Sequence, residues 1–229
     1  MTTATRCILV AALVVLSACG GDNEQTPAEP NVPIVATLGD SITAGAPHWS
    51  PNPGLRTLIA TRGRVTRSSQ WQYWAGAATD GAFRFRNCGV EGDRTDEIEP
   101  RLAGCTAGAD VVVIQGGTND VTQGRTPAAA AANIRDMVRR AQAAGLRALV
   151  TTVPPINRRY PEWARGVRRL NVLIAAVARK TGVSVIDFFG QLEDPRNPNR
   201  MPAGWTADGI HPNVEGYARL GRAAARQLQ

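Results

Sequence analysis

Histidine is scarce in this chain, and one of its two copies lies three residues after an aspartate. This residue, His211, belongs to the segment Asp208-Gly209-Ile210-His211-Pro212. An imidazole can accept a hydroxyl proton, and a nearby carboxylate can fix its tautomer and stabilise the imidazolium that forms. The same segment also fits a turn that begins a helix, with Pro212 at the first helical position. A chemical role therefore requires a nucleophile and an oxyanion hole elsewhere in the chain.

Three other segments contain groups that could complete such a site. Ser41 offers a hydroxyl nucleophile, although it or the preceding Asp40 could equally cap a helix. Residues 87–93 contain glycines, which let a backbone N–H approach a ligand closely but also serve ordinary turns. Asn119 carries a side-chain amide that could donate to an oxyanion, and its segment also fits a plain turn. Each required group is present, with a structural alternative beside it.

The elements that would position these groups form an alternating pattern of short apolar runs and helical segments. The expected strands cover residues 34–38, 82–87, 110–115, 147–152 and 183–188, and the expected helices cover residues 95–102, 127–144, 162–181 and 212–228. This alternation predicts an α/β fold in three layers, with a doubly wound, mostly parallel five-stranded sheet and helices on both faces. Residues 46–81 show only partial helical patterning, which predicts a short helix and long loops.

Three of the candidate segments come directly after an expected strand, and the fourth lies further along the chain, beyond the last expected strand. Ser41 follows the first strand, residues 87–93 the second, Asn119 the third, and Asp208 with His211 the last. Ligands of open α/β sheets bind at the carboxyl ends of the strands. The segments together supply a nucleophile, oxyanion donors, a base and an orienting acid, which predicts an acyl-transfer site.

Four sequence blocks resemble those of the SGNH (GDSL) hydrolase family, and the resemblance extends from Ile34 to about Leu228. The blocks are Gly39-Asp40-Ser41-Ile42, the glycine segment around Gly92, Gly117-Thr118-Asn119-Asp120, and Asp208-Gly209-Ile210-His211-Pro212. The resemblance implies the flavodoxin-like fold of that family. It also implies a serine esterase that hydrolyses carboxylic (acyl) esters without a metal or an organic cofactor.

The resemblance assigns a role to each of these residues. Ser41 is implied to be the nucleophile, His211 the base and Asp208 the orienting acid. The backbone N–H groups of Ser41 and Gly92, together with the side chain of Asn119, are implied to form the oxyanion hole.

The second block departs from the family pattern in one position. Glu91 stands before Gly92, where the family often has a small residue, and a carboxylate beside an oxyanion would be unfavourable unless it points away. Gly89 therefore stays an alternative to Gly92 as the oxyanion donor.

Three functions remain open at this point. The first is an arylesterase-, lysophospholipase- or thioesterase-like enzyme that acts on small-molecule acyl esters. The second is a carbohydrate O-acetylesterase of the same fold. The third is a lipoprotein that only binds ligands, which the presence of Ser41, Asn119, Asp208 and His211 together disfavours.

The amino terminus has the pattern of an exported lipoprotein. Arg6 precedes an apolar run of about eleven residues, which is too short to span a bilayer and typical of a secretory signal. The run ends in a segment that looks like the lipobox of bacterial lipoproteins, in which Cys19 is lipidated; an ordinary secretory signal is the alternative. We expect a signal peptide at 1–18, a flexible tether at 19–33 and the hydrolase domain at 34–229, anchored to a bacterial membrane in the periplasm or at the cell surface.

The formal charge of +7 comes almost entirely from arginine, with Lys180 as the single lysine. The arginines are scattered and are not interleaved with aromatic residues, and no zinc-finger spacing or phosphate-binding glycine loop is present. We therefore expect no nucleic-acid partner and a monomer with a solvated basic surface, favourable near anionic lipid head groups.

Cys88 and Cys105 could form a disulfide in an exported protein. Cys88 follows an expected strand and Cys105 follows the next expected helix, which would place them at opposite ends of an α/β layer. A disulfide requires Cα atoms within about 7 Å. The pattern therefore favours two unpaired cysteines, with the disulfide as the alternative.

Several aromatic residues lie in or near the loops expected at the strand ends, where they could line a substrate pocket or pack in the core. They are Trp49, Trp71, Tyr73, Trp74 and Trp205. Trp205 is the strongest pocket candidate because it lies three residues before Asp208. The second histidine, His48, has no carboxylate motif around it and is expected to be a loop residue.

Overall fold

A computed structural model describes residues 32–157 and 161–229 of the chain. The predicted signal peptide, Cys19 and nearly all of the predicted tether lie outside the described residues. Within these two ranges the protein forms one parallel sheet with helices on both of its faces.

The core of the described region is a five-stranded sheet in the order β2-β1-β3-β4-β5. Its strands are β1 (Ile34–Gly39), β2 (Arg84–Gly89), β3 (Val111–Ile114), β4 (Arg147–Thr151) and β5 (Ser184–Ile186). All four strand pairs are parallel, so the prediction of a mostly parallel five-stranded α/β sheet is confirmed. The chain reverses its direction of travel across the sheet between β1 and β3, which is where open α/β sheets bind ligands.

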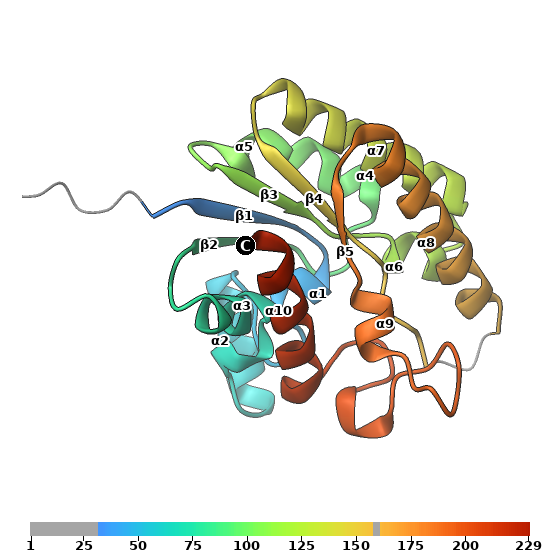
Figure 1. The fold of residues 1–229 in the computed structure, drawn as a ribbon. Coiled ribbons are helices and arrows are strands. Elements are labelled where there is room, and N and C mark those ends of the chain that lie inside the picture. Colours follow the sequence, from blue (N-terminus) through green and yellow to red (C-terminus); the bar gives the residue numbers. More distant parts are fainter. Residues whose placement is uncertain (1–31, 158–160) are drawn as a thin grey trace, which may run out of the picture. The chain divides into compact units, whose positions relative to one another are not determined.

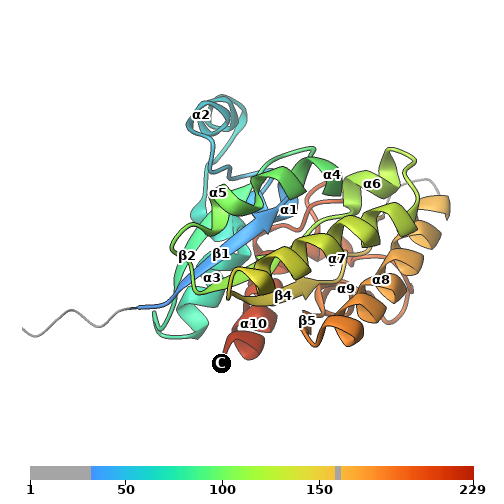
Figure 2. The ribbon, with the colours of Figure 1, turned by 90° about the horizontal axis from the view of Figure 1, so that it is seen from above.

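Helices cover both faces of this sheet (Figures 1 and 2). On one face lie α4 (Thr95–Ile98), α5 (Leu102–Thr106), α7 (Pro127–Ala143) and α8 (Pro161–Thr181). On the other face lie α3 (Trp71–Ala78), α9 (Phe188–Leu192) and α10 (Val214–Leu228). The remaining helices are α1 (Ser41–Ala44), α2 (Pro53–Arg62) and α6 (Thr118–Thr122), and single turns of 3-10 helix occupy Arg67–Ser69, Glu99–Arg101 and Ala203–Trp205.

Each sheet face has its own apolar cluster. Alternate residues of a strand point to opposite faces, so the β3 residues Val112 and Ile114 pack under α7 and α8, whereas Val113 packs under α10. The long helix α8 contributes its apolar stripe to the first cluster, as its periodicity predicted, through buried residues that include Leu170 and Ile174. The two clusters fix the sheet, and therefore the relative positions of the strand ends.

Residues 46–81 contain more helix than their sequence predicted. Both α2 and α3 lie here, and Trp71 of α3 is fully buried, in edge-on contact with Phe85 and Phe188. Trp71 is thus a core residue and not a pocket wall. Its segment was difficult to assign because α3 is short and begins without a side-chain cap.

Two predicted helix boundaries are wrong. The helix expected at 95–102 is a series of three short pieces, because Pro100 lies in a 3-10 turn between α4 and α5 and cannot donate a helical N–H. The last helix begins at Val214 and not at Pro212, because Pro212 pairs with Thr206 in an isolated bridge. Asn213 then caps the helix by accepting a hydrogen bond from the Gly216 N–H at 3.1 Å.

The expectation that Cys88 and Cys105 stay unpaired is wrong. They form a disulfide, and their Cα atoms lie 6.0 Å apart. The chain runs through residues 90–94 and α4 beyond the end of β2 before it turns back, so the end of α5 reaches only the middle of that strand. There the Arg86 guanidinium in β2 donates to the carbonyls of Cys105 at 2.8 Å and Ala107 at 2.6 Å. The length of this connection places the two cysteines side by side.

Candidate active site

Ser41 is the first residue of α1, and only Asp40 separates it from the end of the interior strand β1. Asp40 caps this helix by accepting a hydrogen bond from the Ile42 N–H at 2.9 Å, so the capping role falls on the aspartate and leaves the serine hydroxyl free for other contacts. At Gly39 a Cβ atom would collide with Thr43 Oγ1 and with Gln115 Oε1. The tight strand-to-helix turn that presents Ser41 therefore requires glycine at position 39.

The side chains of Ser41, His211 and Asp208 form one hydrogen-bonded series. His211 Nε2 lies 2.9 Å from Ser41 Oγ, and His211 Nδ1 lies 2.8 Å from Asp208 Oδ2. The other carboxylate oxygen of Asp208 accepts hydrogen bonds from the backbone N–H groups of Ile210 at 2.9 Å and His211 at 2.8 Å. Gly209 has a φ of +84°, which the turn between Asp208 and His211 requires.

The pKa of Asp208 lies well below its usual range. Burial raises this pKa, but the hydrogen bonds from the His211 ring and from the backbone N–H groups of His211 and Ile210 together outweigh burial and lower it. Asp208 is therefore ionised throughout the neutral pH range. An ionised carboxylate that accepts a hydrogen bond from Nδ1 leaves Nε2 as the acceptor that faces the serine.

The loop that carries His211 is held by residues that the sequence did not single out. Thr206 Oγ1 donates to the His211 carbonyl at 2.8 Å and accepts from the Gly209 N–H at 2.9 Å. Asn157, which lies after β4, donates its backbone N–H to the Gly209 carbonyl at 2.7 Å. The Asn157 side chain also exchanges two hydrogen bonds with the backbone of Met201, each at 2.6 Å. These contacts fix the imidazole relative to the strand ends.

In the described part of the chain, neither the backbone N–H of Ser41 nor that of Gly92 donates to an acceptor. By contrast, the Gly89 N–H donates to Asn87 Oδ1 at 2.9 Å, and a Cβ at Gly89 would collide with the backbone of Ala44. Gly89 therefore has a structural role in the packing of β2 against α1. Of the two glycines, Gly92 keeps a donor available.

Asn119 lies at the start of α6, and one of its amide hydrogens bonds to the Asp93 carbonyl at 2.9 Å. An amide carries two hydrogens, so one is still available to a ligand. Gln123, one turn further along, donates to the Gly92 carbonyl at 3.4 Å. The third block is thus attached to the loop of the second block.

Arg101 connects the first two blocks, a role that its position in a predicted helix gave no reason to expect. Its guanidinium donates to the carbonyl of Gly39 at 2.9 Å, to the carbonyl of Cys88 at 2.5 Å, and from Nε to Asp93 Oδ2 at 3.0 Å. The strand ends of β1 and β2 and the Gly92 loop are therefore held by one planar group with several donors.

Asp120 of the third block is a structural anchor. Its side chain is fully buried, and it accepts hydrogen bonds from the Thr95 N–H at 2.9 Å and the Thr95 hydroxyl at 2.8 Å. Arg125 Nε lies 3.6 Å from the same carboxylate. Asp120 thereby fixes the start of α4 against α6, on the side of the site where Asn119 lies.

The aromatic candidates have varied surroundings. Trp205 stacks under the Arg219 guanidinium at 3.6 Å, and Trp49 lies under Arg56 at 5.0 Å. Trp74 donates its indole N–H to the Ser68 carbonyl at 2.8 Å. Tyr73 is 49% exposed. The contacts of Trp205, Trp49 and Trp74 are thus made with neighbouring protein groups, two by stacking and one by a hydrogen bond.

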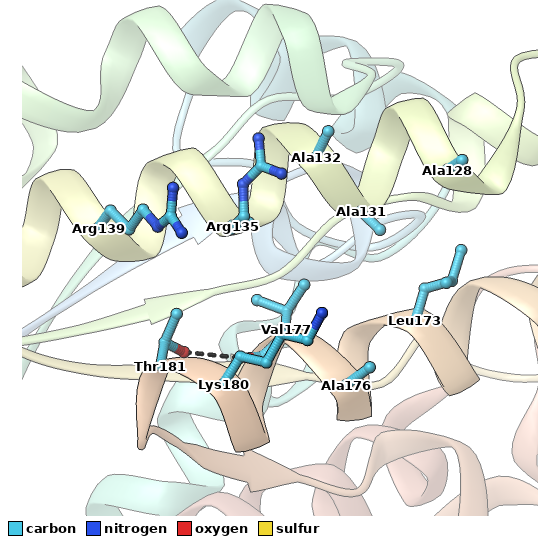
Figure 3. A pocket seen from close by; sticks show the side chains of 10 residues that line it. All are labelled: Ala128, Ala131, Ala132, Arg135, Arg139, Leu173, Ala176, Val177, Lys180 and Thr181. Carbon is cyan, nitrogen blue, oxygen red and sulfur yellow. Dashed lines mark hydrogen bonds between the residues drawn. The ribbon is translucent and has the colours of Figure 1, made fainter.

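The described surface has hollows both near the site and far from it. One of about 210 Å³ lies between α7 and α8, where Leu173 and Val177 form an apolar floor and Arg135, Arg139 and Lys180 stand around it (Figure 3). It contains none of the four sequence blocks. A larger hollow, of about 450 Å³, is lined by residues next to the blocks, including Ala46, His48 and Glu91. His48 is indeed a loop residue, between α1 and α2.

Within residues 32–157 and 161–229, no group of three or more His, Cys, Asp or Glu side chains is arranged to hold a metal ion. Within the same ranges, no helix is both long enough and apolar enough to cross a membrane.

A Ser-His-Asp series at the carboxyl ends of a parallel sheet is the kind of site that serine hydrolases use on several unrelated folds. Residues 37–219 match the GDSL-like lipase/acylhydrolase family. The chain belongs to this family and is a hydrolase that acts on ester bonds. The resemblance to SGNH (GDSL) hydrolases that the four blocks carry is thereby confirmed.

Solved structures with a similar fold include several hydrolases. A GDSL-like lipase from Bacteroides thetaiotaomicron is 20% identical, with a TM-score of 0.64 over 84% of this chain and 86% of that one. An inhibitor-bound aryl esterase from M. smegmatis is 20% identical, with a TM-score of 0.65 over 86% of this chain and 98% of that one. A variant of an acetyl-xylooligosaccharide esterase from Geobacillus stearmophilus is 19% identical, with a TM-score of 0.65 over 86% and 94%. Comparison with curated protein sequences gives no match. At these identities the likeness concerns the fold.

Proposed function

We propose that this protein is a serine esterase in which Ser41 is the nucleophile, His211 the general base and Asp208 the orienting acid. The observation that carries the proposal is the pair of hydrogen bonds at His211, 2.9 Å to Ser41 Oγ and 2.8 Å to Asp208 Oδ2. The first distance lies within the range required for proton transfer from the nucleophile to its base, and the second lets Asp208 orient that base.

The reaction proceeds as two acyl transfers. Ser41 Oγ attacks the ester carbonyl carbon while its proton moves to His211 Nε2, and the carbonyl oxygen becomes an oxyanion. The tetrahedral intermediate expels the alcohol, which takes the proton from His211, and an acyl-serine remains. Water then attacks the acyl-serine with His211 as the base, which releases the carboxylic acid and restores Ser41. Asp208 stays ionised and stabilises the imidazolium in both halves.

The oxyanion is held by the N–H groups of Ser41 and Gly92 and by the second amide hydrogen of Asn119. This assignment is supported by the two N–H groups, which have no acceptor within the described chain. It is also supported by Asn119, whose side chain is fixed by its hydrogen bond to the Asp93 carbonyl. Such fixed donors stabilise developing negative charge without reorganisation during the reaction. Gly92 is preferred over Gly89 because the Gly89 N–H already donates to Asn87.

Two substrate groups remain under this mechanism. Among proteins of similar fold, one is described as an aryl esterase and another as an acetyl-xylooligosaccharide esterase. We propose small-molecule acyl esters as the main substrates, with carbohydrate O-acetyl esters as the second candidate.

The direct test is hydrolysis of p-nitrophenyl acetate by Ser41→Ala beside Ser184→Ala, which alters an exposed serine at the start of β5. We expect Ser41→Ala to lose turnover to the uncatalysed rate and Ser184→Ala to keep the activity of the original chain. Full activity in folded Ser41→Ala would refute the assignment of the nucleophile.

We also propose that the enzyme is exported and anchored to a bacterial membrane through lipidated Cys19. The Cys88–Cys105 disulfide supports export, since disulfides persist in oxidising compartments. The test is membrane fractionation of cells that produce Cys19→Ala. We expect the variant to leave the membrane fraction; a variant that stays there as the original chain does would contradict lipid anchoring.

A further inference from the structure

Helix α2 presents an apolar face that packs into no core. Leu55, Leu58 and Ile59 recur at the spacing of one helix face, yet none of the residues of α2 is buried, and Leu58 is 44% exposed. An apolar helix face normally packs against the body of a protein. Figure 2 shows α2 standing off from the layers of the fold. Its apolar side chains instead line the hollow of about 450 Å³.

This hollow borders the chain segments that carry Ser41 and Gly92, although neither of these two residues lines it. Its wall includes Glu91, the residue directly before Gly92, and Ala46, whose N–H donates to the Ser41 carbonyl at 3.0 Å. The Ala46 carbonyl accepts a hydrogen bond from the Tyr217 hydroxyl at 2.8 Å. Burial raises the pKa of Tyr217 well above its ordinary value, so the hydroxyl stays a donor. One wall of the hollow is thus fixed to the nucleophile and to α10.

Most of the remaining lining is apolar. Pro47 and the three apolar residues of α2 contribute hydrocarbon surface, and the charged members, Arg62 and Glu91, are exposed and half-buried respectively. Long charged side chains can turn their charged ends to water while their stems cover apolar surface. A hollow of this size and lining suits an apolar ligand group, since ligand pockets typically measure roughly 300–1,000 Å³ and are mainly apolar.

The amino-terminal end of α2 is firmly held. Asn52 caps it by accepting from the N–H groups of Gly54 at 2.9 Å and Leu55 at 3.3 Å. Arg56 donates to the carbonyls of Ser50 at 2.7 Å and Pro51 at 2.8 Å, and it stacks over Trp49. The helix therefore keeps its apolar face directed at the hollow although no core lies behind it.

The position of the hollow indicates which part of an ester it would hold. The leaving alcohol must lie against His211, which protonates it. None of the residues of the His211 loop lines the hollow, which instead borders Glu91 and Ala46. The acyl part lies across the scissile bond from this alcohol, so a hollow that borders the Ser41 and Gly92 segments without the His211 loop can receive it.

We propose that the hollow beneath α2, lined by Ala46, Pro47, Leu55, Leu58 and Ile59, is the binding pocket for the acyl chain and that the preferred substrates are esters of medium-length apolar acids. This inference rests on the proposed Ser41 mechanism. Since burial of one methylene is worth about 0.8 kcal/mol, kcat/KM is expected to rise roughly threefold to fourfold for each methylene that enters the pocket.

The experiment compares kcat/KM for p-nitrophenyl octanoate and acetate in the full chain and in two matched variants. Leu58→Asp places a carboxylate in the pocket, and Ala60→Asp places the same group on the opposite, exposed side of α2. We expect octanoate to be preferred at least about tenfold by the original chain. We expect Leu58→Asp to lower this octanoate-to-acetate ratio by about tenfold or more, and Ala60→Asp to leave it unchanged.

A second variant, Leu55→Trp, fills the pocket and should lower octanoate turnover much more than acetate turnover, which lowers the octanoate-to-acetate ratio. If acetate hydrolysis depends on Ser41 but the ratio does not exceed one, or if the ratio is the same in Leu58→Asp and Ala60→Asp, the acyl pocket is refuted and the mechanism stands. If acetate hydrolysis persists in Ser41→Ala, the mechanism itself fails. A preference for acetate over octanoate would favour acetylated carbohydrates over apolar acyl esters.

Discussion

Ser41 Oγ and His211 Nε2 lie 2.9 Å apart although 170 positions separate the two residues in the sequence. A different part of the fold positions each of these two side chains. Ser41 is presented by a turn at the end of β1 that Asp40 caps, and His211 is held in a loop that Thr206 and Asn157 fix. The contact therefore depends on the whole sheet and on both of its apolar clusters, since these set the distance between the turn and the loop.

Loss of the Asn119 amide should slow the reaction more than it weakens substrate binding. An oxyanion forms only after Ser41 attacks, so we expect Asn119→Ala to lower kcat about 10²- to 10³-fold with little change in KM. The measurement is steady-state hydrolysis of p-nitrophenyl acetate. Gln123→Ala is the matched control, because Gln123 also bonds to the Gly92 loop but through the Gly92 carbonyl. An equal loss in both variants would show that loop support, and not oxyanion binding, is the role of Asn119.

The Cys88–Cys105 disulfide should stabilise the fold substantially. It closes a loop with a sequence separation of 17, and loop closure of about this length is worth about 3 kcal/mol in the unfolded state. We expect the double variant Cys88→Ser, Cys105→Ser to lose about this free energy of unfolding in urea. Reductant should bring the original chain to the same value and leave the double variant unchanged. A free energy of unfolding that does not respond to reductant would contradict the prediction.

Asp40 should make the folded protein less stable as the pH rises, whereas a carboxylate in an ion pair makes a protein more stable as the pH rises. Burial raises the pKa of Asp40 from 3.8 to about 6. The folded state therefore holds a proton that the unfolded state has released, and stability falls as pH rises through that window. At 1.36 kcal/mol per pKa unit, the loss is about 3 kcal/mol.

The variant Asp40→Asn keeps the acceptor for the Ile42 N–H and removes the ionisation. The original chain loses stability over this range and Asp40→Asn does not. The free energy of unfolding of Asp40→Asn minus that of the original chain should therefore rise by about 3 kcal/mol between roughly pH 3 and pH 7.5. The comparison uses urea unfolding at a series of pH values. A difference that is flat over this range would show that Asp40 titrates near its ordinary value.

The alternation of apolar runs with helical segments was sufficient to predict the sheet, and the strand-end rule was sufficient to predict which residues meet. The structure brings together Ser41, Asp208 and His211 at that edge, and the roles of these residues stay predictions. Strand and helix periodicity are local properties, which is why they can be seen in a sequence.

The features that the sequence did not reveal depend on contacts made only after folding. Arg101 and Asn157 act on backbone carbonyls of distant segments, and no residue pattern marks such a carbonyl in advance. The pairing of Cys88 with Cys105 depends on how far α5 descends along β2, which the length of the preceding connection sets. Helix α2 lacks a buried face, so its periodicity gave only a weak signal after two closely spaced prolines.

The most direct test of the proposed Ser41 mechanism is covalent labelling by a fluorophosphonate, followed by peptide mapping with mass spectrometry. A fluorophosphonate reacts with a serine that a neighbouring base activates. We predict one adduct, on Ser41, which is absent in Ser41→Ala and forms much more slowly in His211→Ala. An adduct on another residue, or no adduct on a protein that hydrolyses esters, would contradict the assignment of Ser41 as the nucleophile.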